Sequence, residues 1–198
     1  MLRHVAGALL LLGGTAPMCR AQNTVATQDH TWDFSVWAAG ETGEETTNSL
    51  TQAQIWSAGV LIGRRLTDEK GRSWWQGSLE YGADVAPLFI QTAPNIEHGI
   101  AFTPVILRWN SSLHAGPVEP YIELAGGGVV TSENLPAGDT SNFNFSARGG
   151  GGIYLVAKGR RRALDIGCRW SHISNANLGN RNPEFNGIEF IVGYHWFK

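Results

Sequence analysis

Cysteine and long apolar runs are both scarce in this chain of 198 residues, and each scarcity narrows the possible folds. The two cysteines are Cys19 and Cys168. Because we expect Cys19 to be removed with a leader segment, Cys168 would be left without an intrachain disulfide partner. No apolar run after residue 21 is long enough to cross a bilayer as a helix. Any membrane-spanning part must therefore consist of strands, since only helices and closed barrels satisfy their backbone groups in lipid.

Positive charge is also limited. The chain carries 15 lysines and arginines against 17 aspartates and glutamates, which gives a formal net charge of -2. Without a basic stripe, nucleic acid is not expected as a partner. No group of histidine, cysteine and acidic residues has the spacing of metal ligands, so we expect no metal and no other cofactor.

The first residues have the three parts of a secretory signal peptide. A basic start containing Arg3 is followed by an apolar run through Leu12 and then by small residues up to Ala21. This pattern predicts cleavage after Ala21. We therefore expect residues 1–21 to be a signal peptide and residues 22–198 to form a single domain. Export without disulfides suits a bacterial envelope.

The rest of the chain shows the alternation of apolar and polar residues that is typical of strands. The clearest stretch is 75–85, where apolar and small residues alternate with polar ones over about ten positions, as in a transmembrane β-strand. Similar patterns recur along the chain. The eight expected strands are 31–41, a segment around 56–62, 75–85, 99–109, 118–130, 143–155, 163–174 and 187–197.

The lengths of the expected connections also alternate. We expect long loops at 42–49, 87–98, 131–142 and 175–186, and shorter ones at 67–72, 110–117 and 158–162. Outer-membrane barrels have short periplasmic turns and longer external loops. The sequence therefore predicts an all-β protein, an eight-stranded antiparallel transmembrane up-and-down β-barrel with both termini in the periplasm. An interfacial belt of tryptophans at the periplasmic rim agrees with this: Trp32, Trp74, Trp75, Trp109 and Trp196. The alternative is a soluble lipocalin-like barrel, with the same apolar face turned inward.

Residues 163–174 combine this strand pattern with reactive side chains. The apolar residues that end with Cys168 and Trp170 are followed in the same register by His172 and Ser174. Residues two apart in a strand point the same way, so an imidazole and a hydroxyl should lie together on the outer face, near the cell exterior. Such a pair can act as base and nucleophile. The simpler interpretation is a solvated histidine at the rim and a serine that begins a turn.

The third member of such a site is less certain from spacing. Glu189 returns to the height of His172 across the hairpin, and Asn175 could donate to an oxyanion. However, the apolar pattern of the last strand would turn Glu189 into the barrel. Either a bulge near Gly187 resets the register, or a loop residue takes its place, with Glu184 and Asn182 as the candidates.

Several short motifs together resemble the PagL family of outer-membrane lipid A 3-O-deacylases, also described as acyloxyacyl hydrolase-like. These motifs are His172-Ile173-Ser174-Asn175-Ala176, Asn182-Pro183 and Asn186-Gly187-Ile188-Glu189. The resemblance implies an eight-stranded barrel in the bacterial outer membrane with a Ser-His-Glu triad. In that triad His172 is the general base, Ser174 the nucleophile and Glu189 the orienting acid, while Asn175 serves the oxyanion hole.

The resemblance also implies a substrate and a reaction. The enzyme would hydrolyse the ester-linked 3-hydroxyacyl chain of lipid A, with lipopolysaccharide as substrate, outer-membrane lipid around it and no metal. The competing hypotheses are a non-enzymatic barrel that acts as an adhesin or structural protein, and a soluble periplasmic lipid-binding barrel. A homodimer is compatible with the sequence.

Overall fold

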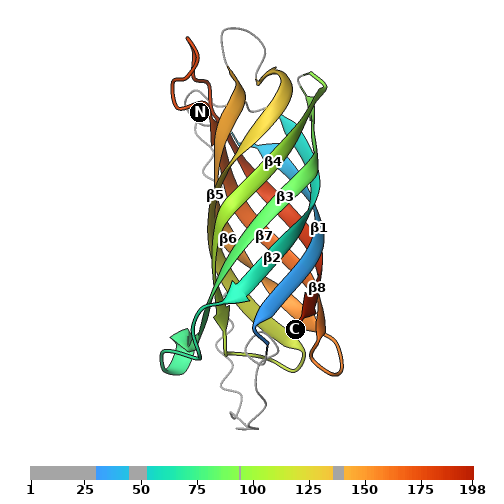
Figure 1. The fold of residues 1–198 in the computed structure, drawn as a ribbon, viewed down its shortest axis with the longest axis vertical. Coiled ribbons are helices and arrows are strands. Elements are labelled where there is room, and N and C mark those ends of the chain that lie inside the picture. The colour runs from blue at the N-terminus through green and yellow to red at the C-terminus, as the bar shows by residue number, and fades with distance from the viewer. Residues whose placement is uncertain (1–29, 45–52, 94, 136–140) are drawn as a thin grey trace, which may run out of the picture.

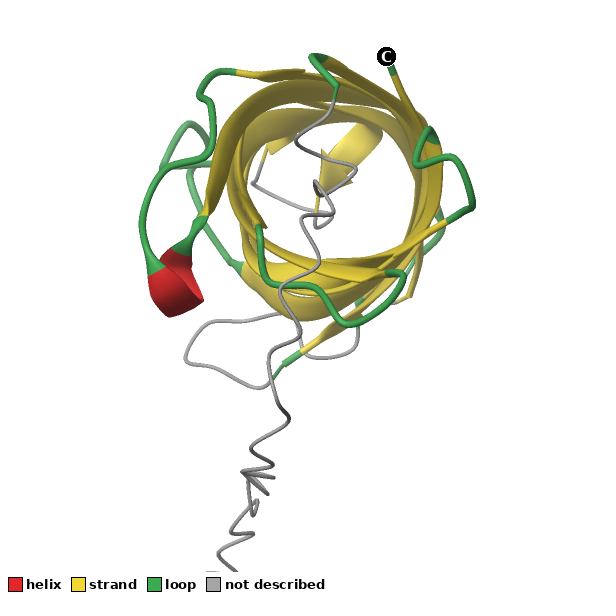
Figure 2. Ribbon diagram, turned by 90° about the horizontal axis from the view of Figure 1, so that it is seen from below, coloured by secondary structure: helices red, strands yellow, loops and turns green. Residues whose placement is uncertain are grey.

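Eight antiparallel strands close into one barrel, as the sequence predicted (Figure 1). The computed structural model describes residues 30–44, 53–93, 95–135 and 141–198. Each strand pairs with its neighbours in the sequence, and β8 closes the ring on β1. Viewed along its axis, the barrel is a continuous ring of strands (Figure 2). The strands are β1 (Trp32–Gly43), β2 (Gln54–Arg65), β3 (Gly77–Ala93), β4 (Glu97–Ser111), β5 (Val118–Leu135), β6 (Ser141–Val156), β7 (Arg162–Ser174) and β8 (Phe185–Phe197).

Within these ranges the only helical element is a single 3-10 turn, η1 (Ser73–Trp75). None of the helical structure found there has the length and apolar character needed to cross a bilayer. The predicted signal peptide, residues 1–21, lies outside the described residues.

Both ends of β3 and the start of β4 differ from the expected strand boundaries. The predicted loop 87–98 is mostly strand, because β3 continues to Ala93 and β4 already begins at Glu97. The register between β3 and β4 shifts between Ala86 and Phe89, beside Pro87. A β-bulge leaves a residue out of the ladder and so tolerates a missing N–H donor. Conversely, β3 begins only at Gly77, so the connection from β2 runs over 66–76 rather than 67–72.

The outer wall of the barrel is apolar along every strand. On β7, Leu164, Ile166 and Trp170 are 39–45% exposed, whereas the residues between them are buried. The same alternation holds on β8, where Phe190 and Val192 are exposed. Apolar side chains therefore cover the outside and charged ones fill the inside. The soluble-barrel alternative requires the opposite arrangement and is contradicted.

The lumen is packed with paired charges. The Arg108 guanidinium lies 2.8 Å from Glu123, and that carboxylate also contacts Arg169 at 2.7 Å. Between β1 and β8, the His195 Nδ1 lies 2.8 Å from Asp33. Because these groups neutralise one another out of contact with water, they brace opposite walls of the barrel. Toward the end of β7 and the start of β8, buried apolar side chains form a cluster: Ala53, Ile55, Phe89, Val129, Leu135, Ile173 and Phe185.

Candidate active site

His172 and Ser174 lie next to each other at the end of β7. The strand begins at the end of the barrel that holds both the start of β1 and the end of β8, and it finishes at the opposite rim (Figure 1). The His172 Nε2 is 3.0 Å from the Ser174 Oγ. Both residues are half-buried and share the outward register of Trp170. The structure thus places an imidazole and a hydroxyl in hydrogen-bond contact on the apolar outer wall.

Trp170 supports the imidazole from below. Its ring stacks on that of His172, with a centroid distance of 5.8 Å and an interplanar angle of 19°. Trp170 is itself 45% exposed on the outer wall. The stack restricts rotation of the imidazole about its side-chain bonds, so the ring keeps its edge toward Ser174.

The second nitrogen of the imidazole contacts Asn186. The His172 Nδ1 is 2.8 Å from the Asn186 Oδ1, and the two residues are direct partners across the β7–β8 ladder. Asn186 is 6% exposed. Its amide nitrogen donates in turn to the Glu184 carboxylate at 3.4 Å. These contacts form a continuous polar chain, which we call the outer relay: Ser174, His172, Asn186 and Glu184.

Glu189 is not part of this chain. The register between β7 and β8 is unbroken from Arg162 to Ile173, so the bulge considered near Gly187 is not present. Glu189 therefore pairs with Arg169 across the ladder and points into the lumen. Its carboxylate lies 3.1 Å from Arg169 and 3.7 Å from Arg148. The structure does not bring this predicted residue to His172.

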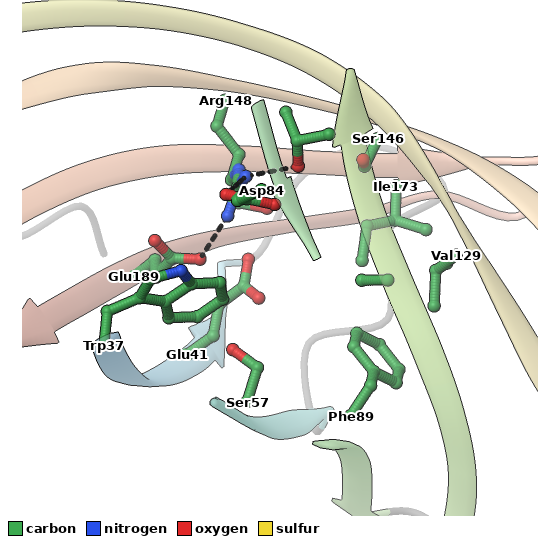
Figure 3. Close-up of a pocket in the computed structure, with 13 residues that line it drawn as sticks. Trp37, Glu41, Ser57, Asp84, Phe89, Val129, Ser146, Arg148, Ile173 and Glu189 are labelled. Carbon is green, nitrogen blue, oxygen red and sulfur yellow. Dashed lines mark hydrogen bonds and ion pairs between the residues drawn. The ribbon is translucent and has the colours of Figure 1, made fainter. Parts of the chain in front are cut away.

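Figure 3 shows the surroundings of Glu189. It lines a small lumen cavity of about 30 Å³, where Arg148 lies between Asp84 and Glu189. Ile173 of β7 reaches the same cavity from the inner face of the strand. The backbone of β7 therefore separates this cavity from His172 and Ser174 on the other face.

Asn175 is occupied in the loop that follows β7. Its Nδ2 donates to the Arg181 carbonyl at 2.7 Å, and its Oδ1 accepts from the Asn177 N–H at 2.9 Å. Its own N–H donates to the Asn182 side chain at 2.9 Å. Asn175 is 1% exposed. The side chain therefore fixes the 175–182 loop instead of projecting toward the hydroxyl of Ser174.

The alternation of the last strand could have identified Asn186, but a search limited to carboxylates does not consider an amide. Ile188 and Phe190 belong to the outward register of β8, and residue 186 falls in the same register. Residue 186 is also the direct partner of His172 across the ladder, so its side chain faces the imidazole. Among the residues that the structure describes, no group of histidine, cysteine and acidic side chains could hold a metal ion.

The arrangement suits proton transfer from an alcohol. A neutral imidazole with its hydrogen on Nδ1 has a free electron pair on Nε2, which can accept the Ser174 proton. The oxygen that remains can attack an electrophilic carbon that approaches from the side of the membrane. No charged group has to move for this step.

Comparison with known proteins agrees with the fold and the motif. A family model described as lipid A 3-O-deacylase (PagL) matches residues 22–195. The chain is similar to the crystal structure of the outer membrane enzyme PagL, with a TM-score of 0.58 and 17% identity, covering 80% of this chain and 97% of that one. It is also similar to the crystal structure of Neisserial surface protein A (NspA), with a TM-score of 0.58 and 17% identity, covering 84% of this chain and 97% of that one. No curated protein sequence matches it.

Proposed function

Because the chain belongs to the PagL family of lipid A 3-O-deacylases, we propose that it is an esterase that removes the 3-O-linked 3-hydroxyacyl chain of lipid A. The barrel lies in the outer membrane. The observation that carries the proposal is the 3.0 Å contact between the His172 Nε2 and the Ser174 Oγ on the outer wall. Lipid A is a substrate that a site facing the hydrocarbon can reach directly. We further propose that residues 1–21 direct the chain to export.

The proposed reaction proceeds through an acyl-enzyme. The Ser174 Oγ attacks the ester carbonyl while its proton passes to the His172 Nε2. The tetrahedral intermediate collapses, the bond to the sugar oxygen breaks, and His172 returns the proton to that oxygen. Water, deprotonated by His172, then attacks the acyl-serine. The bond between the acyl carbon and the Ser174 Oγ breaks, His172 returns the proton to that oxygen, and the 3-hydroxy fatty acid is released. The proton and electron pairs balance without any cofactor.

The position of the pair fits this substrate. Polar side chains that face lipid are costly, and the outward register of His172 and Ser174 is otherwise apolar. They lie at the end of β7, at the rim opposite the start of β1 and the end of β8. We infer that this rim lies at the level of a membrane interface. The ester linkages of lipid A lie between sugar and hydrocarbon, at the same level.

The test uses purified protein in detergent micelles mixed with lipid A. We expect release of a free 3-hydroxy fatty acid, detected by mass spectrometry, from the native protein and none from Ser174→Ala. If the folded native protein releases no fatty acid, the esterase proposal is wrong and the non-enzymatic surface barrel is supported instead.

A further inference from the structure

We propose that Asn186, oriented by Glu184, is the positioning residue that selects the reactive tautomer of His172. The inference rests on the proposed esterase function of Ser174 and His172. It assigns the orienting role to a neutral amide on the outer wall, in place of the lumen carboxylate of Glu189. In the outer relay, Glu184 contacts Asn186, and Asn186 contacts His172.

The first step concerns the orientation of the Asn186 amide. An amide has a donor end and an acceptor end, and its hydrogen-bond partners decide which end points where. Glu184 Oε2 lies 3.4 Å from the Asn186 Nδ2. An ionised carboxylate can only accept, so the nitrogen end must face Glu184. The oxygen end is then directed at His172, where it lies 2.8 Å from Nδ1.

The second step concerns the imidazole. Because the Asn186 Oδ1 can only accept, the His172 Nδ1 must carry the hydrogen. Nε2 is then unprotonated in the neutral ring and faces the Ser174 Oγ at 3.0 Å. With the amide reversed, the hydrogen would lie on Nε2 and the ring could no longer accept the serine proton.

The third step explains why an amide suits this position. Asn186 is 6% exposed on a wall that faces hydrocarbon. A carboxylate buried there would pay a large desolvation cost, whereas a hydrogen-bonded amide pays much less. Glu184 lies outside the strand, in the connection before β8, and is half-buried. The charge is thus separated from the imidazole by the amide, through which it acts.

The experiment compares Asn186→Ala, Asn186→Asp and Glu184→Ala, alone and combined. Asn186→Ala should lower kcat by about 10²–10⁴-fold with little change in KM, as expected for a lost tautomer. Asn186→Asp should recover kcat to within about tenfold of the native protein, because an aspartate accepts from Nδ1 in either orientation. It should also shift the acidic limb of the pH profile to higher pH, since a carboxylate stabilises the imidazolium.

The double variant tests the role of Glu184 directly. Glu184→Ala should lower kcat about fivefold in the native background, given a single long hydrogen bond to a charged group. In the Asn186→Asp background it should not lower kcat, because a symmetric carboxylate needs no orienting partner and the substitution also removes a like charge beside it. Glu133→Ala removes an exposed carboxylate from the same end of the barrel and serves as the matched control. It should leave kcat unchanged.

Two results overturn the inference. One is an Asn186→Ala variant that keeps kcat within twofold of the native protein. The other is an equal effect of Glu184→Ala in both backgrounds. The tautomer of His172 can be measured without any ester cleavage, which separates this inference from the esterase proposal. ¹⁵N NMR of histidine-labelled protein should find the His172 hydrogen on Nδ1 in the native protein. In Asn186→Ala it should find a mixture of the Nδ1 and Nε2 tautomers. A hydrogen on Nε2 in the native protein contradicts the inference, whether or not any ester is cleaved.

Discussion

The lumen and the outer end of β7 both contain a carboxylate near a basic side chain, but they use it differently. In the lumen, Glu189 contacts Arg169 and Arg148 directly and is almost fully buried. At the outer wall, the Glu184 carboxylate is separated from His172 by the amide of Asn186. Arginines keep their charge permanently and so lock Glu189 into a structural role. A histidine gains and loses a proton, and its neutral neighbour leaves it free to do so.

The comparison also shows why the two faces of one hairpin perform different tasks. Arg169 and His172 are three residues apart on β7, and they point to opposite sides of the sheet. The inner side is a packed network without room for a substrate, since the cavity beside Glu189 holds only about 30 Å³. The outer side borders the membrane, where a lipid can approach. The residues that stabilise the barrel and those proposed to react with substrate therefore lie on opposite faces of one strand.

The largest expected effect comes from the reacting pair on the outer wall. Ser174→Ala and His172→Ala should each reduce the rate of lipid A deacylation by about 10³-fold or more, because a nucleophile and its base act as a unit. The double variant should be no slower than either single variant. The rate of fatty-acid release from micellar lipid A measures this. Additive losses in the double variant would show that the two residues act separately.

Substitution of the lumen carboxylate of Glu189 should greatly lower the stability of the barrel and should change kcat only slightly. Glu189→Gln leaves Arg169 and Arg148 without a shared counter-charge, which should lower the free energy of unfolding by about 3 kcal/mol. The kcat of the folded fraction should stay within about threefold of the native value, because the carboxylate does not contact His172. Thermal unfolding in detergent, followed by circular dichroism, gives the first quantity. A loss of kcat comparable to that of Ser174→Ala would restore Glu189 to the catalytic site.

The pH profile should follow the imidazole of the outer relay. Protonation fills the electron pair of Nε2, so activity should fall on acidification, because a base must be unprotonated to accept the serine proton. The lumen charges do not contact the imidazole and should not add a second step between pH 6 and 8. Initial rates from pH 5 to 8 measure the profile. A flat profile over this range would contradict a role for His172 as base.

The smallest predicted effect concerns the ring stack under the imidazole. Trp170→Leu keeps the outer wall apolar but removes the stacking contact with His172. We expect kcat to fall about two- to tenfold, the equivalent of a single aromatic contact. Cys168→Ala, two residues earlier on the same face, is the matched control and should leave kcat unchanged. An effect of both substitutions equally would indicate a general change in the wall.

Much of this architecture was predictable from the sequence because a barrel wall imposes period two. The alternation on β7 placed His172 and Ser174 on the outer face, and the structure has them there. Strand ends were harder to predict: a loop was expected from residue 87, whereas β3 continues through a register shift beside Pro87. The number of strands depends on a repeated pattern, whereas their ends depend on individual contacts.

The contact between His172 and Asn186 was not predicted, for a different reason. A family motif favours a carboxylate, and Glu189 has the right residue type at a similar height. Its parity along β8 is wrong, because the side chains of Ile188 and Phe190 occupy the outward register. The alternation of β8 indicated that Asn186 faces outward. An amide can accept a hydrogen bond from His172, however, only if its oxygen points toward the imidazole. That orientation depends on Glu184, whose position in the loop could not be derived from spacing.

The most direct test of the account is the mass of lipid A from bacteria that express this chain, because it measures the proposed reaction in the membrane where the barrel lies. The account predicts that native protein removes one 3-hydroxyacyl group from lipid A and that Ser174→Ala, present in equal folded amount, removes none. Lipid A that keeps all its acyl chains beside folded native protein, or loses one equally with Ser174→Ala, would contradict it.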